Sequence, residues 1–228
     1  YGSTNAPGSP GSGAGAGVYG NAWGGDGGGL IRVQASGDVT VNGTISANGL
    51  KDPESPGWRS GGGSGGGIYV TCRRLLGSSG LLEAKGGGPT YGEGGGGGGG
   101  RVAVWASRHG FSGTLTALFG TSGYAGTLNG ATGTVVKGYL PEPSIYPTNQ
   151  FGRGVALGAL AVAGTLTNLD IQLSNAGEGT NAMLWSLSTT NSWIGFASAS
   201  GTVATGAVVT MTLTNDATAL AAGVYTGQ

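Results

Sequence analysis

Apolar and polar side chains alternate along most of the short apolar segments of this chain. Residues 101–106 (RVAVWA) and 113–118 (GTLTAL) show this period of two, and a glycine-containing turn separates them. Such alternation is the pattern of a β-strand with one buried face, and no segment carries the 3.6-residue apolar stripe of a helix. We therefore expect an all-β chain with almost no helix.

The alternating segments belong to an internal repeat. Residues 31–49, 68–86 and 101–119 align without a gap, with starts 37 and 33 residues apart, and a degenerate fourth copy begins near Thr134. Each copy follows a glycine run and cannot bury its apolar face alone, so neighbouring copies must stack on it. The repeat predicts a glycine-rich parallel β-solenoid (β-helix) with about one coil per copy. A β-sandwich built from the same hairpin-like pairs is the alternative.

Glycine supplies 54 of the 228 residues, including all of residues 94–100. A run of this kind is either a flexible loop or a segment where neighbouring backbones approach too closely for a Cβ atom. The glycine shows no regular period of three, which argues against a collagen helix. Because each run precedes the same strand of the repeat, we expect residues 94–100 to be ordered and packed against their neighbours.

The composition changes after Lys137. Residues 138–147 contain three prolines, so we interpret 141–147 as a stiff linker between a repeat domain (1–140) and a second domain (148–228). The second domain has strand candidates at short spacing, which predict a β-sandwich. These candidates are residues 165–173, 182–188, 193–196 and 208–214.

Two families resemble parts of the chain. The segment RVAVWASRHGFSGTLTA at 101–117 resembles the glycine-rich β-repeats of bacterial surface and secreted proteins, a resemblance that covers about residues 15–138. It implies an extracellular structural or adhesive role without a known active site.

The segments LSNAG (173–177), WSLS (185–188), SWIGFASASGTV (192–203) and DATALAAGVYTG (216–227) resemble the immunoglobulin-like (Ig-like) domains called BACON. That resemblance implies an Ig-like sandwich, often attached to carbohydrate-active proteins. Members of the family usually continue past the tyrosine motif, so the last strand is short, lies outside these residues or comes from another subunit.

The charges and the single cysteine narrow the possible partners. Lys plus Arg and Asp plus Glu number 10 each, so no long-range field attracts nucleic acid or anionic lipid. No apolar run approaches the roughly 20 residues that span a bilayer. Cys72 is the only cysteine, which excludes an intrachain disulfide and a multi-thiolate zinc site.

The low charge and the start at Tyr1 fit an exported protein, so we expect an extracellular or cell-surface location with neither nucleic-acid binding nor membrane insertion.

The sequence offers no set of residues for catalysis. His109 is the only histidine and lies in a predicted turn. We interpret it as a solvated loop residue rather than as a member of a catalytic triad. The repeat region's acids are scattered at loop-like positions, without the convergent carboxylates of a glycosidase. We expect no enzyme activity, catalytic residue, metal or cofactor. These acids are Asp26, Asp38, Asp52, Glu54, Glu83 and Glu93.

Two tryptophans of the second domain could contact a sugar. Trp185 lies in the middle of a predicted strand and is better explained as a core residue, whereas Trp193 follows an Asn-Ser turn and suits either role. Trp193 is the single candidate ligand-binding residue.

We therefore expect an extracellular structural protein, a building block of a surface layer or self-assembling filament. Open strand edges at the ends of a solenoid, and a last strand completed between subunits, would make it a homo-oligomer or polymer. The alternative is a glycan-binding cell-surface adhesin fragment whose partner is a polysaccharide.

Overall fold

Strands form where the alternating segments of the sequence can bury one face. The computed structural model describes residues 2–17, 23–53, 60–90, 94–122, 128–146, 166–221, 223 and 225. Within these ranges it contains fourteen strands and no helix, which confirms the all-β prediction for them. The chain divides into two units, Tyr1–Gly138 and Tyr139–Gln228.

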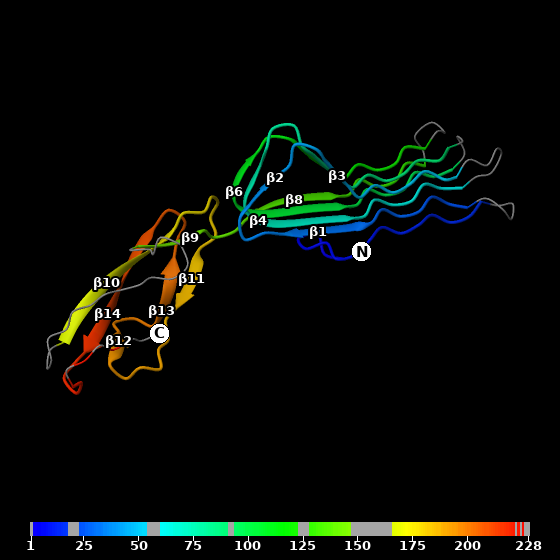
Figure 1. Ribbon diagram of the computed structural model, residues 1–228. Helices are drawn as coiled ribbons and strands as arrows, with labels where there is room; N and C mark the ends of the chain where they lie inside the picture. Colours follow the sequence, from blue (N-terminus) through cyan, green and yellow to red (C-terminus); the bar gives the residue numbers. More distant parts are fainter. Residues whose placement is uncertain are drawn as a thin grey trace. The chain divides into compact units, whose positions relative to one another are not determined.

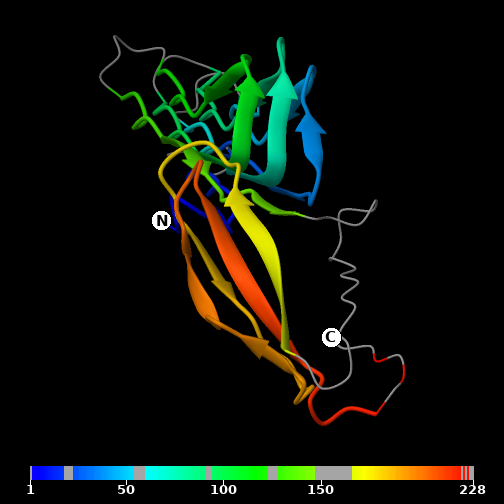
Figure 2. The same cartoon turned by 90° about the vertical axis from the view of Figure 1, so that its left-hand side faces the viewer.

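Unit 1 contains two open, mostly parallel sheets (Figures 1 and 2). Sheet A has the order β1 (Leu30–Gln34), β4 (Gly67–Gly77), β6 (Arg101–Phe111), β8 (Thr134–Tyr139), and β2 (Asp38–Thr40) also pairs with β4. Sheet B consists of β3 (Thr44–Ser46), β5 (Leu81–Glu83) and β7 (Thr114–Thr116). We call one sheet A strand together with the sheet B strand that follows it a layer.

Rows of apolar side chains run across the layers and form the core of unit 1. Ile45, Leu82 and Leu115 pair in register across sheet B. They belong to the same core cluster as Ile68 and Val102 of sheet A. Parallel in-register pairing places equivalent side chains on one face, so each layer supplies the partner that a single layer lacks.

The register differs by one residue from the ungapped repeat alignment. Val102 pairs with Ile68, although the alignment matched Arg101 to that position. A one-residue shift exchanges the two faces of a strand, and the alignment would have placed the Arg101 side chain in the core. The turn before β7 is one residue shorter than the turn before β5, so the alignment is correct again at Leu81 and Thr114.

The glycine runs form extended segments that lie side by side beyond sheet A (Figure 1). Each segment is hydrogen-bonded to several neighbours, with a repeat of three residues. This is the repeat of a polyproline II-type helix, which has three residues per turn and no internal hydrogen bonds. The run 94–100 shows this repeat in three directions. The N–H groups of Gly96 and Gly99 donate to the carbonyls of Leu128 and Ala131, and those of Gly97 and Gly100 donate to Gly87 and Ala84. The carbonyls of Gly95 and Gly98 accept from the N–H groups of Gly62 and Gly65.

The expectation that residues 94–100 pack against their neighbours is therefore confirmed. In the run 94–100 the backbone hydrogen bonds repeat every three residues, although glycine itself has no such period in the sequence. In the run 94–100, positions that face a neighbouring backbone have no room for a Cβ atom, whereas Gly95 and Gly98 do. Ser64 shows the sequence signature, because the serine takes an open position between the tightly packed Gly63 and Gly65.

The segment 2–9 lies across the outer face of sheet A. The Asn5 carbonyl accepts a hydrogen bond of 2.7 Å from Nε1 of Trp105, and Pro7 lies against Gly67. This cover explains why Ala103, whose side chain points away from the core, is fully buried.

Unit 2 contains antiparallel pairs. Sheet C has the order β12 (Ile194–Phe196), β14 (Val208–Asp216), β10 (Leu166–Asn175), β9 (Pro143–Tyr146), and sheet D pairs β11 (Met183–Ser186) with β13 (Ser200–Val203). Their apolar faces meet in one cluster, which includes Ile171 and Met211 of sheet C and Val203 of sheet D. Strand β9 lies within the segment that we interpreted as a linker. Pro143 is its first residue, a position where the missing N–H group is tolerated.

Candidate binding face

The outer face of sheet C combines paired polar side chains. Alternation along β14 directs Met211 and Leu213 towards the core and leaves Thr212 and Thr214 on the opposite face. Thr212 lies opposite Asp170 of β10 and donates its hydroxyl hydrogen to Oδ1 of Asp170 at 2.7 Å.

Thr214 lies opposite Asn168 and makes the equivalent bond of 3.2 Å to Oδ1 of Asn168. These two cross-strand bonds hold four side chains in place on an exposed surface. We call Asn168, Asp170, Thr212, Thr214, Asp216 and Trp193 the polar face.

Trp193 lies at the end of this face. Its carbonyl accepts a hydrogen bond of 2.8 Å from the N–H of Asp216, which continues the β12–β14 ladder by one step beyond Ile194. Residues opposite each other in an antiparallel ladder share a face, so Trp193 lies on the same side as Asp216. The Trp193 ring meets the ring of Tyr225 edge to face, with 6.3 Å between centroids and 60° between planes. Trp193 is half-buried, and Tyr225 is 45% exposed.

Asp216 supplies a negative charge beside the tryptophan. The hydroxyl and the N–H of Thr218 both donate to Oδ1 of Asp216, at 2.5 and 3.0 Å. These hydrogen bonds lower the pKa of Asp216 below its ordinary value, and the bond from the Thr218 hydroxyl has the larger effect. The carboxylate is therefore ionised at neutral pH.

The chemistry of the polar face is that of recognition. It offers hydroxyl, amide and carboxylate groups that exchange hydrogen bonds with hydroxyls, next to an aromatic surface suited to an apolar ring face.

Sequence reasoning identified Trp193 but missed the rest of the polar face and Tyr225. The available signal was the alternation in TLTNLDIQL and VVTMTLTND, whose polar positions include Asn168, Asp170, Thr212 and Thr214. Trp185 packs against the core cluster of unit 2, in agreement with its interpretation as a core residue.

His109 lies in strand β6, not in a turn, because β6 continues to Phe111. Its Nε2 atom lies 2.8 Å from the carbonyl oxygen of Gly138.

The scattered acids have separate surroundings. Asp38 makes an exposed ion pair with Arg74, and Glu83 accepts a hydrogen bond of 2.6 Å from Asn48. Asp52 is buried and accepts hydrogen bonds from Ser60 and Thr90. Glu54 and Glu93 lie outside the described residues. Within the described part of the chain, no group of three or more His, Cys, Asp or Glu residues is placed to hold a metal ion.

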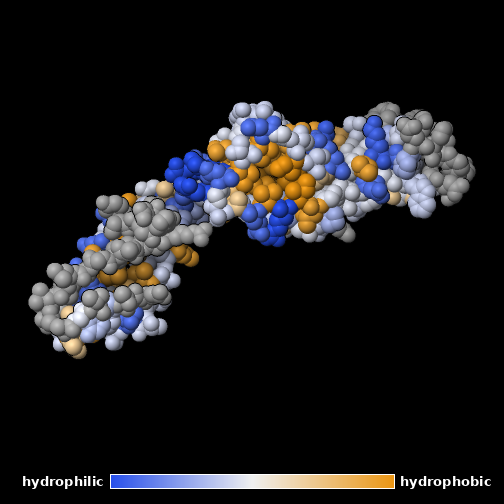
Figure 3. Space-filling view, in the orientation of Figure 1, coloured by the Kyte–Doolittle hydropathy of each residue, from blue (hydrophilic) through white to orange (hydrophobic). Residues whose placement is uncertain are grey.

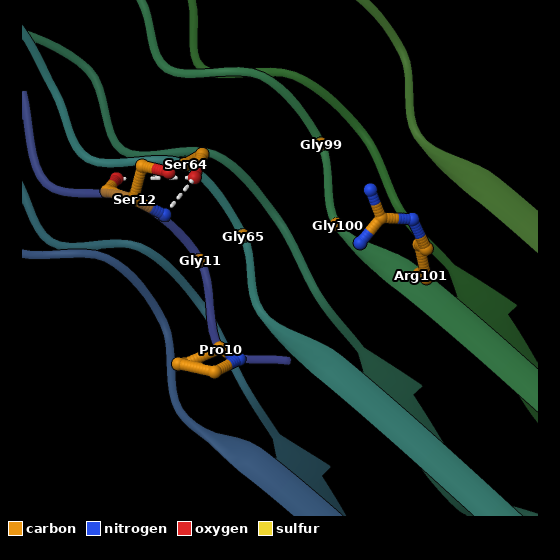
Figure 4. A pocket seen from close by; sticks show the side chains of 8 residues that line it. All are labelled: Pro10, Gly11, Ser12, Ser64, Gly65, Gly99, Gly100 and Arg101. Atoms are coloured by element: carbon orange, nitrogen blue, oxygen red, sulfur yellow. Dashed lines mark hydrogen bonds between the residues drawn. The ribbon is translucent and has the colours of Figure 1, made fainter. Parts of the chain in front are cut away.

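A small hollow of about 150 Å³ lies in unit 1 between the segment at Pro10 and the glycine runs. Figure 4 shows Ser12 and Ser64 joined by hydrogen bonds on one side, with the Arg101 side chain on the other. The walls are mainly glycine backbone, whose N–H groups donate hydrogen bonds to neighbouring segments. Arg101 is the single charged residue among those that line the hollow.

Among the residues described, no helix is both long and apolar enough to cross a membrane. The chain matches no family model, no curated protein and no solved structure.

Proposed function

We propose that the protein is a non-enzymatic, extracellular structural protein that assembles end to end. In this proposal unit 1 acts as a glycine-rich parallel β-solenoid, and unit 2 is an Ig-like β-sandwich. The resemblances and the low charge content support this assignment. The observation that carries it is the open end of unit 1 formed by β1, β2 and β3.

Apolar side chains are accessible at this end. Ile31, Val33, Val39 and Ile45 are only partly buried, although they pack against the core cluster. The equivalent Ile68, Val70 and Leu82 of the next layer are fully buried. Figure 3 shows the resulting apolar area within the outline of β1, β2 and β3 in Figure 1. Within the described residues, the first layer therefore has the apolar side chains of an interior layer but no further layer packed on its outer side.

The strand edges at this end favour a neighbour of the same type. Among the described residues, strands β1 and β3 are the last members of their sheets on this side, so their outer edges are candidates for pairing with another chain. At the opposite end sheet B stops at β7, where Leu115 is partly buried, and Val135 of β8 is 45% exposed. Two different ends that both carry accessible apolar side chains and terminal strands favour a head-to-tail contact, which would produce an open chain of subunits.

A charge introduced at the open end tests this proposal. Ile45→Lys places an ammonium group in the apolar area, whereas Thr44→Lys adds the same charge to the exposed neighbouring position of β3. We expect size-exclusion chromatography with light scattering, and electron microscopy, to show polymers of the wild type and of Thr44→Lys. Ile45→Lys should be monomeric with a thermal transition that remains cooperative.

A wild-type protein that is monomeric at every concentration tested would overturn the proposal. A closed dimer would overturn the head-to-tail arrangement, and so would equal assembly of both lysine variants.

A further inference from the structure

We propose that the polar face of sheet C binds a neutral polysaccharide, with Trp193 as the aromatic contact. This site is independent of the open end in unit 1, since a monomer carries the complete polar face. Three features support the proposal: the order of the polar groups, the local charge and the space beside Trp193.

The polar groups are fixed before a ligand arrives. The Thr212–Asp170 and Thr214–Asn168 hydrogen bonds connect the neighbouring strands β14 and β10. The two bonded pairs lie about 6.8 Å apart along the strands, because they are two residues apart in sequence. Side chains that are already ordered lose little conformational entropy on binding. A repeating polymer of hydroxyl-bearing rings matches an array that itself repeats along the strands.

The charge of this region selects against anionic ligands. From Tyr139 onwards the sequence contains one basic residue, Arg153, and four acids, two of which, Asp170 and Asp216, lie on the polar face. Carboxylates accept hydrogen bonds from sugar hydroxyls, but they repel uronic acids and sulfate esters. The expected ligand is therefore a neutral glycan.

Gly195 leaves the surface beside Trp193 open. It lies opposite Thr214 in the β12–β14 ladder, two residues after Trp193, and therefore on the same face. The nearest heavy atom to a Cβ built on Gly195 is Cβ of Thr214, at 3.8 Å. The missing side chain gives a ring stacked on Trp193 access to the Thr214–Asn168 pair.

Affinity electrophoresis of the full chain tests the proposal. The gels contain hydroxyethylcellulose, xylan, galactomannan or laminarin, with alginate as the anionic comparison. We expect retardation by at least one neutral polymer and none by alginate. Trp193→Ala should weaken binding by about tenfold or more, which corresponds to roughly 1.4 kcal/mol. Trp193→Phe, which keeps an aromatic ring, should retain most of the binding.

Trp23→Ala is the matched control, because Trp23 is 75% exposed and belongs to unit 1. Thr212→Val removes a hydroxyl while keeping a β-branched side chain, so it tests the polar rung even if Trp193→Ala does not fold. No retardation by any neutral polymer would overturn the proposal. Retardation by alginate alone would overturn it as well, as would equal binding by the wild type, Trp193→Ala and Thr212→Val.

Discussion

A Cβ atom on Gly97 would lie 2.0 Å from the carbonyl oxygen of Gly63 in the neighbouring glycine segment. Real Cβ atoms do not approach a backbone oxygen so closely, and neither segment can move alone because each is hydrogen-bonded to further neighbours. One residue later, at Gly98, the nearest atom is 3.7 Å away. The position of Gly97 therefore accepts only glycine, whereas the position of Gly98 has room for a side chain.

Gly97→Ala should destabilise the protein, and Gly98→Ala should not. We expect the free energy of unfolding to fall by about 2–4 kcal/mol for Gly97→Ala, since a methyl group forced between backbones separates two hydrogen-bonded segments. Gly98→Ala should lie close to the wild type, because its methyl group has space and alanine lowers the entropy of the unfolded chain. Urea denaturation of both variants measures the difference. Equal stability would contradict the packed arrangement of the glycine segments.

The buried row of sheet B predicts a second large effect. Leu82 is fully buried between Ile45 and Leu115. Leu82→Ala leaves a cavity that the layers on both sides cannot fill, so we expect a loss of about 2–5 kcal/mol in unfolding experiments. Leu50→Ala is the control, since Leu50 is 57% exposed. A similar loss for both variants would argue against this core.

Asp52 predicts a pH dependence of stability. Burial raises the pKa of its carboxyl, but hydrogen bonds from Ser60 and Thr90 outweigh burial and leave the pKa below its ordinary value. A pKa that is lower in the folded state stabilises the protein fully above the unfolded pKa of about 3.9, and this contribution is lost as the pH falls through the folded value. Asp52→Asn should therefore cost about 1–3 kcal/mol at pH 7 and progressively less below pH 4.

Thermal unfolding of the wild type and of Asp52→Asn between pH 3 and pH 7 measures this convergence. Asp26→Asn is the control, because Asp26 is exposed. A difference between the wild type and Asp52→Asn that is constant across this range would contradict the ionised hydrogen-bonded carboxylate.

The sequence predicted the elements of unit 1 better than their exact register. Alternation located the strands, and the glycine before each strand correctly indicated packed segments. Local similarity matched Arg101 with Ile68, whereas the core accepts Val102 there, because burying a guanidinium would cost more than shortening the next turn by one residue. The choice depends on contacts between layers that no single segment contains.

The polar face was harder to predict for a similar reason. Trp193 stood out as an aromatic residue after a turn, but its neighbours Asp216 and Tyr225 come from segments more than twenty residues away. The pairing of β12 with β14 brings Asp216 to it. Sequence patterns give the face of a strand, and only the pairing gives the neighbours across it.

Cys72 provides a probe for whether the glycine segments and the sheets unfold together. The thiol is 3% exposed in β4, and burial, followed by the negative charge of Asp38, raises its pKa. A thiol-specific aromatic disulfide reagent at pH 8 should therefore modify it only when unit 1 opens, and urea should bring the reaction to the rate of a free thiol.

If the two parts form one cooperative unit, Gly97→Ala should accelerate this modification about tenfold for each 1.4 kcal/mol that it loses in urea denaturation, since the reaction then follows the population of the open state. Cys72→Ala, which should show no reaction, controls for the reagent. Destabilisation by Gly97→Ala without any change in the rate of modification would show that the glycine segments separate while the core around Cys72 stays closed.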